Sequence, residues 1–355
     1  MHIIQKKTML KKYKNKDLTD LNTFRMRVKC RQFIEYDSVA DLIDIDFSEL
    51  AAPVRHIGGG SNLLFREDFD GTILHSAVKF IYELPEEDDL RRSDDETLVS
   101  VGAGVIFDDF CEWAAENGYW GPENLSHIPG ETGAAAVQNI GAYGAEAADI
   151  IRQVCCYDTE EEEFVRFNAE DCGYGYRTSI FKSPELKDRY IVTNVIFALS
   201  KTAKPRLDYG HVRTAVEEAT GGNAVTPGLV RKVITDIRKA KLPEVSEIGS
   251  AGSFFKNPVV PEEKFRKVQE AVEGCEVPHY NTADGVKIPA AFLIEQCGWK
   301  GYSYGNAAVY AKQPLVLINA TGDARPSEII DLKDRITASV KEKFGIELQP
   351  EVEII

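Results

Sequence analysis

The sequence predicts an α+β protein of two domains. The chain has 355 residues, and a domain usually holds roughly 100–200 residues. The first half consists of short apolar runs punctuated by glycine, whereas the second half changes to amphipathic segments of helical period. Mixed strands and helices of this kind indicate an α+β architecture, with a boundary expected near residues 200–210.

Short apolar runs predict the strands, because a half-buried strand needs only four to eight such residues. The predicted strands lie at 53–57, 63–65, 72–74, 98–101, 190–199 and 315–319, with a final strand over 346–355 that Pro350 interrupts.

Apolar residues at helical spacing predict a helix over 106–117, with Gly118 as its C-terminal cap. Thr226 and Pro227 are typical of an N-cap and a first helical position. Three further helices are predicted over 261–272, 290–297 and 327–344.

Composition and charge exclude several classes of protein. Acidic residues outnumber basic ones by 57 to 42, for a formal charge of −15, which disfavours binding to nucleic acid or to an anionic membrane. No apolar run approaches the roughly 20 residues that span a bilayer. Residues 1–16 hold six lysines and no acidic residue. Since they lack the apolar core of a signal peptide, they are predicted to be a frayed basic tail.

The cysteines and histidines predict no metal site. Seven cysteines without a CxxC pair fit neither a disulfide framework nor a zinc site, and the six histidines are scattered. Buried free thiols in a reducing compartment are therefore expected.

Three glycine-rich loops suggest a cradle for an anion. They lie at 58–60, at 102–104 and in the segment IPGETGAAAVQNIGAYG at 128–144. Successive backbone N–H groups in a tight turn form a donor array for phosphate. Any one loop alone reads as an ordinary turn, but three in one half favour a bound diphosphate. The second loop does not continue as GxGxxG, so a Rossmann-type site is not expected.

Several polar residues could carry chemistry, although each has a plainer reading on its own segment. Arg177 lies among aromatic residues in GYGYRTSIFK and could clamp a carboxylate, or it could be a surface arginine. Ser253, in SAGSFFKNP, lacks the GxSxG pattern of a nucleophile and is either a turn serine or a proton donor. Glu351 reads as a strand-face charge. Tyr209 and Lys241 could contact phosphate.

Together, the motifs resemble the UDP-N-acetylenolpyruvoylglucosamine reductase family, from about residue 22 to the end of the chain. The matching pieces occur in the family's order: NTF at 22–24, GGGSN at 58–62, IPGETGAAAVQNIGAYG at 128–144, GYRTSIFK at 175–182, KLP at 241–243, AGSFFKNP at 251–258 and QPEVEI at 349–354.

The resemblance implies an FAD-binding unit of the vanillyl-alcohol-oxidase type over 17–205, built from two subdomains. It also implies an α+β substrate-binding domain over 206–345, and a strand near 346–355 that returns to the flavin. The cofactors would be FAD and NADPH, and the partner a UDP-sugar. A cytoplasmic enzyme is implied, with no nucleic acid, no membrane and no obligate protein partner. The implied FAD-binding residues are Gly58, Gly59, Gly60, Ser61, Asn62, Gly130, Gly133, Asn139, Gly141 and Gly144.

The implied reaction passes a hydride from NADPH to FAD and then to C3 of the enolpyruvyl group of a UDP-sugar, in peptidoglycan precursor synthesis. By resemblance, Arg177 stabilises the developing charge, Ser253 protonates C2 and Glu351 assists at the carboxylate. The family positions around the substrate match Tyr209, Lys241 and Asn257. The stretch from 207 to 241 resembles the longer branch of the family, in which a tyrosine loop closes over the substrate.

Two positions depart from the family pattern. Ala134 and Ala135 replace a pair that often includes a serine, and Glu353 stands where an arginine is expected. Two alternatives stay open: a flavin-dependent oxidase or dehydrogenase of the same fold, and a nucleotide-sugar binding protein or transferase without flavin.

Overall fold

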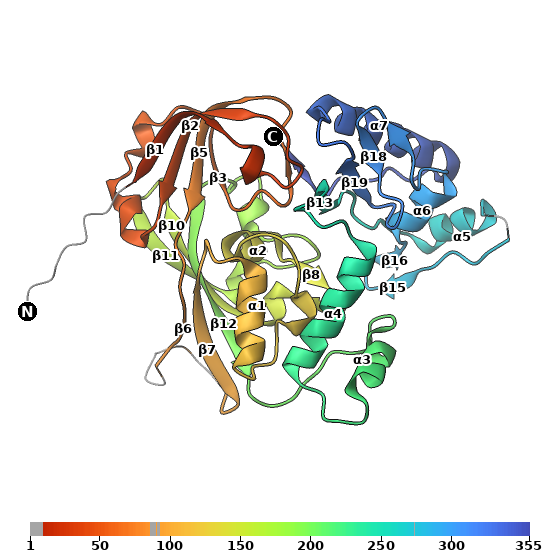
Figure 1. Cartoon of the computed structure of the whole chain (residues 1–355), viewed down its shortest axis with the longest axis horizontal. Helices are drawn as coiled ribbons and strands as arrows, with labels where there is room; N and C mark the ends of the chain where they lie inside the picture. Colours follow the sequence, from red (N-terminus) through yellow and green to blue (C-terminus); the bar gives the residue numbers. More distant parts are fainter. Residues whose placement is uncertain (1–9, 86–89, 91–92, 273) are drawn as a thin grey trace, which may run out of the picture. The chain divides into compact units, whose positions relative to one another are not determined.

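The chain forms two compact units, each assembled from separate segments of the sequence (Figure 1). The computed structural model describes residues 10–85, 90, 93–272 and 274–355. Within them, the N-terminal unit comprises residues 10–16, Cys30–Gly59 and Asp70–Arg238, and the C-terminal unit comprises Asp17–Lys29, Gly60–Phe69 and Lys239–Ile355. These limits do not coincide with the predicted domains. Residues 17–29 and 60–69 join the C-terminal unit, whereas 206–238 join the N-terminal one.

The first sheet of the N-terminal unit has four strands in the order β1-β2-β5-β3. They are β1 (Lys11–Asp17), β2 (Lys29–Tyr36), β5 (Phe69–Ser76) and β3 (Val54–Ile57). β5 is buried along most of its length, and β3 runs parallel to it. Strands in parallel pairs are usually covered on both faces, which fits the unbroken burial of β5 from Gly71 to Ser76.

Strand β1 corrects the predicted basic tail. Residues 11–16 form the edge strand of the first sheet instead of fraying. Its lysines keep the exposed edge solvated, which suits a strand with only one neighbour. Residues 1–9 of the predicted tail lie outside the described residues.

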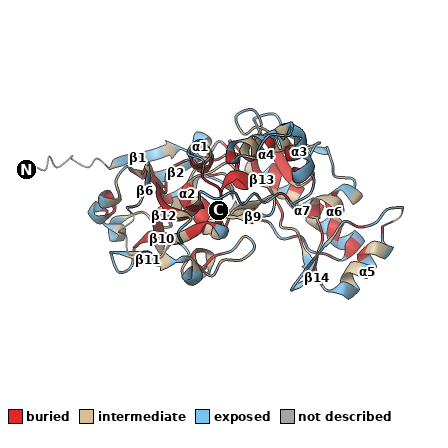
Figure 2. Cartoon of the chain, turned by 90° about the horizontal axis from the view of Figure 1, so that it is seen from below, coloured by how far each residue is buried: buried red, intermediate tan, exposed pale blue. Residues whose placement is uncertain are grey.

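The second sheet has five strands, all antiparallel, in the order β11-β10-β12-β7-β6. They are β11 (Glu163–Asn168), β10 (Ile151–Asp158), β12 (Tyr190–Ser200), β7 (Glu96–Gly102) and β6 (Ile81–Glu83). Buried residues run along β10 and β12 (Figure 2). The two sheets are the two subdomains expected of this unit.

Helices cover the second sheet and extend the N-terminal unit. They are α1 (Phe107–Glu116), α2 (Thr132–Gln138), α3 (Val212–Thr220) and α4 (Pro227–Lys241). The ring of Phe110 on α1 stacks on Phe197 of β12, with centroids 4.5 Å apart. An ion pair links α4 to α1: Nη1 of Arg231 on α4 lies 2.8 Å from Oδ1 of Asp108 on α1. After α2, the short strands β8 (Gly141–Ala142) and β9 (Ala145–Glu146) form a hairpin.

The C-terminal unit has a four-stranded sheet in the order β13-β19-β18-β17. Its strands are β13 (Gly249–Ser253), β19 (Val316–Asn319), β18 (Ala307–Val309) and β17 (Ser303–Tyr304). The longest helix, α7 (Pro326–Phe344), buries one apolar stripe, as its burial colours in Figure 2 indicate; the stripe includes Ile329, Leu332, Ile336 and Val340.

Smaller elements complete the C-terminal unit. A second sheet has the order β14-β16-β15; the helix α5 lies between β14 and β15 in sequence, and α6 follows β16. These elements are β14 (Val259–Val260), α5 (Glu262–Glu270), β15 (Tyr280–Thr282), β16 (Gly285–Lys287) and α6 (Ala290–Gln296). The last strand, β20 (Glu353–Ile354), pairs in parallel with β4 (Leu63–Leu64).

Most of the predicted elements are confirmed, with shifts of one to three residues at their ends. The prediction of a final strand over 346–355 is wrong in extent, because only Glu353–Ile354 is paired in a strand. Pro350 makes a single bridge to Phe255 and has no N–H to continue a ladder. Strands β10 and β11 were not predicted.

The thiols are free, but not all of them are buried. Cys30, Cys111, Cys156 and Cys172 are buried, whereas Cys275 is exposed, so the expectation of buried thiols is wrong for Cys275. In the described part of the chain, no group of three or more His, Cys, Asp or Glu side chains could hold a metal ion. Nor does any helix of that part combine the length and apolar character that crossing a membrane requires.

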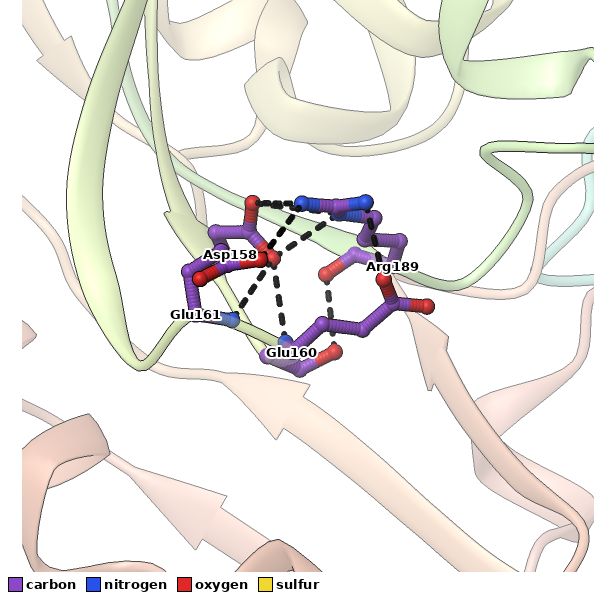
Figure 3. A network of polar contacts seen from close by, with 5 residues as sticks. Asp158, Glu160, Glu161 and Arg189 are labelled. Carbon is purple, nitrogen blue, oxygen red and sulfur yellow. Dashed lines mark hydrogen bonds and ion pairs between the residues drawn. The ribbon is translucent and has the colours of Figure 1, made fainter.

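A polar network closes the end of the second sheet (Figure 3). Asp158, at the end of β10, receives Nε and Nη2 of Arg189, which directly precedes β12. The same carboxylate accepts the backbone N–H groups of Glu160 (3.0 Å) and Glu161 (3.3 Å) in the turn to β11. Burial would raise the pKa of Asp158, but these hydrogen bonds, led by Arg189, hold it below its ordinary value.

We predict that Asp158→Asn lowers the midpoint of thermal unfolding by about 2–4 °C at pH 7. A carboxyl with a depressed pKa stabilises the fold above its unfolded pKa and loses that effect as pH falls through the folded value. The difference between wild type and variant should therefore shrink below about pH 4, as scanning calorimetry across pH would measure. Glu161→Gln is the control, since its exposed side chain lies 3.9 Å from Arg189. An equal loss in both variants would contradict the role of Asp158.

Candidate active site

Three glycine-rich loops meet in the N-terminal unit. A Cβ on Gly58 would lie 3.1 Å from Glu131 Oε2 and 3.3 Å from Ala134 Cβ. A Cβ on Gly133 would lie 3.0 Å from the Cβ of Ala103, whose carbonyl accepts the N–H of Gly133 at 3.0 Å. The loops at 58–59, 102–104 and 130–134 are therefore packed together by contacts that larger side chains would prevent.

The glycines of the loop at 102–104 have a structural reason of their own. A Cβ on Gly102 would clash with the carbonyl of Val78, and one on Gly104 with the carbonyl of Ser76. These two glycines allow β7 and the following turn to pass close to a neighbouring segment. The structure therefore favours the interpretation of this loop as an ordinary turn whose glycines serve packing.

For the other two loops, binding of a diphosphate stays a prediction. A Cβ on Gly59 would make only ordinary contacts, with Glu131 Oε1 at 3.9 Å and the Cα of Gly130 at 4.0 Å, so Gly59 lies against the loop at 130–134. Gly130 has a φ of +123°, which other residues rarely adopt. Backbone without side chains, in irregular turns, exposes N–H donors that suit phosphate oxygens.

The segment after α2 is held from within by Asn139, which is fully buried. Its Nδ2 donates to Glu146 Oε2 (2.8 Å) and to the carbonyl of Gly175 (2.9 Å), and its Oδ1 accepts the N–H of Ala148 (2.9 Å). The amide thus supports the loop, and a contact between Asn139 and FAD stays a prediction. Gly144 lies in the turn of the hairpin that follows, between β8 and β9, with a φ of +80°.

Arg177 docks on the same segment. Its Nη2 donates to the carbonyl of Gly141 at 2.6 Å, and its Nη1 to that of Asn139 at 3.3 Å. A Cβ on Gly141 would lie 2.8 Å from Nη1, so this glycine makes room for the guanidinium. Arg177 has a φ of +57°, a strained conformation for a residue with a side chain. Two motifs that lie apart in the sequence are thereby joined.

In the C-terminal unit, Ser253 and Glu351 belong to neighbouring segments. Ser253 ends β13, and the carbonyl of the next residue, Phe254, accepts the N–H of Glu351 at 2.8 Å. Both Ser253 and Glu351 are half-buried. The backbone hydrogen bond fixes the spacing of the two segments that carry the predicted proton donor and its assisting carboxylate.

The GGGSN motif is divided between the units. Gly58 and Gly59 belong to the N-terminal unit, and Gly60, Ser61 and Asn62 to the C-terminal one. Asn62 Nδ2 donates to the carbonyl of Glu351 at 3.1 Å, and the carbonyl of Asn62 accepts the N–H of Glu353 at 3.0 Å. Asn62 therefore anchors the C-terminal segment, a role that the sequence did not predict.

The predicted substrate residues have separate surroundings. Tyr209, 47% exposed in the N-terminal unit, sets its ring against the edge of Tyr143, with centroids 5.9 Å apart. In the C-terminal unit, Lys241 is the exposed last residue of α4. Asn257 Oδ1 accepts the N–H of Ala290, the first residue of α6, at 2.9 Å.

Comparison with known proteins decides the family. A family model described as the C-terminal domain of UDP-N-acetylenolpyruvoylglucosamine reductase matches residues 243–355, and one described as an FAD binding domain matches residues 33–167. The reductase of Bacteroides fragilis (strain YCH46) is 47% identical over 336 residues, which cover 94% of this chain and 97% of that protein. The reductase of Porphyromonas gingivalis (strain ATCC 33277) is 42% identical over 344 residues, covering 95% and 97%.

The chain belongs to the UDP-N-acetylenolpyruvoylglucosamine reductase family. The crystal structure of the family member from Thermus caldophilus aligns with a TM-score of 0.65 at 23% identity, over 98% of this chain and 99% of that one. The predicted family and the predicted α+β fold, with an FAD-binding unit and a separate C-terminal domain, are thus confirmed. The roles of the individual residues stay predictions.

Two groups of residues near the predicted site of this reductase-family chain escaped the sequence analysis. His75 lies between Glu35 and Glu131, with 3.2 Å from each ring nitrogen to a carboxylate oxygen. The three residues come from distant segments, and no spacing in the sequence relates them.

The second group is centred on Arg238 of α4. Its Nε donates to the carbonyl of His127 at 3.1 Å, and its guanidinium also hydrogen-bonds Tyr143. Burial lowers the pKa of Arg238. Since Arg231 and Arg238 are seven residues apart, they share a face of α4, and this spacing could have flagged them.

We predict that Gly60→Ala lowers the free energy of unfolding by about 2–4 kcal/mol. Gly60 has a φ of +63°, and a Cβ there would clash with the carbonyl of Leu21, which is backbone and cannot rotate away. Gly298→Ala is the control in the same unit. Its φ is +78°, but nothing lies within 4 Å of the added Cβ, so only the backbone cost of about 1 kcal/mol is expected. Urea titration compares the two, and equal losses would show that packing against Leu21 is not a constraint.

Proposed function

We propose that this chain reduces UDP-N-acetylglucosamine enolpyruvate to UDP-N-acetylmuramate in peptidoglycan precursor synthesis, with NADPH as the reductant and FAD as the bound cofactor. The observation that carries the proposal is the 47% identity to a reductase of that name over 94% of the chain. We place the reaction in the cytoplasm, where NADPH is available, and require no protein partner for it.

The glycine loops would hold the cofactor. When bound, FAD supplies a hydride carrier between NADPH and C3 of the enolpyruvyl group. Backbone N–H groups at Gly58, Gly59 and Gly130 would donate to its diphosphate, and the packing of the loops at 58–59 and 130–134 against each other supports this assignment. The remaining residues assigned to the cofactor are Gly60, Ser61, Asn62, Gly133, Asn139, Gly141 and Gly144.

Three side chains would manage charge and protons at the substrate. Hydride addition at C3 leaves negative charge at C2, spread into the adjoining carboxylate. Arg177 would stabilise that charge, and its guanidinium is already oriented by the carbonyls of Asn139 and Gly141. Ser253 Oγ would give its proton to C2, and Glu351 would orient the substrate carboxylate.

The other assigned residues would bind the nucleotide-sugar part. Lys241 supplies a positive charge for the diphosphate of the substrate, and exposed Tyr209 supplies a ring and a hydroxyl. Because Asn257 uses Oδ1 to cap α6, its Nδ2 is the atom left to donate.

We predict two spectral changes when the purified protein is titrated without oxygen. NADPH should bleach the flavin absorbance, and UDP-N-acetylglucosamine enolpyruvate should then restore the oxidised spectrum. Bleaching without recovery would show that the protein is a flavoprotein that does not reduce this substrate, which is the result that the oxidase or dehydrogenase alternative predicts. A protein that takes up no FAD yet binds a UDP-sugar would overturn the proposal in favour of the flavin-free alternative.

We further predict that Ser253→Ala slows recovery of the oxidised spectrum by at least about 100-fold, the usual range for loss of a positioned proton donor. Bleaching by NADPH should keep its wild-type rate, since the serine acts only on the substrate. Ser250→Ala is the control on the same strand. Rapid-mixing spectroscopy measures both steps, and equal slowing of bleaching and recovery would refute the proton-donor role.

A further inference from the structure

His75 occupies a buried position between two carboxylates. His75 is 8% exposed. Its Nδ1 lies 3.2 Å from Oε2 of Glu35 on β2, and its Nε2 lies 3.2 Å from Oε1 of Glu131, which directly precedes α2. A carboxylate oxygen only accepts hydrogen bonds, so both ring nitrogens must donate to satisfy this geometry. The arrangement therefore calls for the doubly protonated, positively charged imidazole.

The charges around His75 balance when it is protonated. Glu35 also receives Nζ of Lys11 from β1 at 2.7 Å, so two cations face two carboxylates. On the neighbouring strand β3, His56 bonds to the hydroxyl of Tyr36 at 2.8 Å, and burial lowers its pKa to about 3, which keeps it neutral. Burial by itself would lower the pKa of His75, but the hydrogen bonds that its ring donates to Glu131 and Glu35 raise that pKa overall.

Glu131 connects this cluster to the glycine loops. While Oε1 faces His75, Oε2 lies 3.1 Å from the position of a Cβ on Gly58, and no described residue hydrogen-bonds to it. The carboxylate thus stands directly beside the backbone assigned to the FAD diphosphate. An unbalanced negative charge at that place would repel phosphate, whereas a carboxylate neutralised by an imidazolium would not.

We propose that His75 is a positioning residue of the FAD cradle: in its charged form it holds Glu131 beside Gly58 and Gly59 and cancels the charge of that carboxylate, so that the diphosphate can bind. The inference rests on the proposed assignment of these loops to FAD. By linkage, FAD affinity falls as pH rises through the titration of His75, and bound FAD in turn favours the protonated ring.

The test measures FAD dissociation from the diluted holoprotein by the rise in flavin fluorescence between pH 6 and 9. For the wild type, we expect the dissociation constant to rise about tenfold across this range, the size of effect that follows from losing one charged hydrogen bond. His75→Gln should bind FAD about tenfold more weakly than wild type at pH 6 and show little dependence on pH. His279→Gln, a histidine of the C-terminal unit outside this cluster, should match the wild type.

A double variant separates charge balance from simple structural support. His75→Gln combined with Glu131→Gln removes the unbalanced carboxylate, so its FAD affinity should return to within about threefold of the wild type. If His75 only supports the fold, the double variant should be as weak as His75→Gln or weaker. That result would overturn the inference, and so would a wild-type affinity that does not change with pH.

A second measurement needs no variant. Slow exchange of the imidazole carbon-bound hydrogen, followed by mass spectrometry, gives the titration midpoint of His75 in the wild-type protein with and without FAD. The midpoint should move to higher pH when FAD is bound, and an unchanged midpoint would overturn the inference while leaving the flavin assignment intact. A wild-type protein that binds no FAD would instead overturn the proposed function.

Discussion

The N-terminal unit depends on glycines that let one stretch of backbone lie directly against another. At Gly102 and Gly104, the absence of a side chain allows the end of β7 and the turn after it to lie against the carbonyls of Val78 and Ser76. Gly133 likewise lies against the Cβ of Ala103. Each contact is closer than an ordinary side chain allows, so the loops reach one region of the unit.

Glycine-rich loops have few side chains of their own to hold them in place. Hydrogen bonds from longer polar side chains elsewhere in the chain stabilise them. The side-chain amide of Asn139 makes all of its hydrogen bonds to the segment after α2 and its neighbours. Arg177, whose φ is positive, donates to the carbonyl of Gly141. In the C-terminal unit, Asn62 plays the same part for the segment of Glu351. Each of these side chains is polar and donates to at least one backbone carbonyl, so their amide and guanidinium groups fix the course of the loops.

The sequence predicted those elements whose pattern is strong and local. The helix α7 has its apolar stripe at regular spacing, and α1 is followed by Gly118, one residue after its C-cap Asn117. Strand β10 was missed because polar Arg152 and Gln153 break the alternation, and Gln153 is buried by pairing its amide with Asn168. The limits of the compact units were also missed, since they depend on pairing between distant segments.

For the candidate site, the motifs indicated which residues to examine but not what holds them. Arg177 and Ser253 could be singled out, because their segments combine glycine, aromatic and charged residues in unusual density. The cluster of Glu35, His75 and Glu131 could not, because three isolated residues meet only when β2, β5 and the loop before α2 are assembled. The capping bond of Asn257 likewise depends on the position of α6, 33 residues away.

The interleaving of the two units bears on how the chain is made by the ribosome. Residues 17–29 and 60–69 leave the ribosome early, yet they belong to a unit whose remaining part begins at Lys239. β4 pairs with β20, and Asn62 hydrogen-bonds to Glu351, which lies 289 residues later in the chain. The two early segments can contact each other, as Thr23 and Gly60 do, but the pairing of β4 and the bond from Asn62 must wait until Glu351–Ile354 emerge. The N-terminal unit has all of its residues once Arg238 is made, and it can form first.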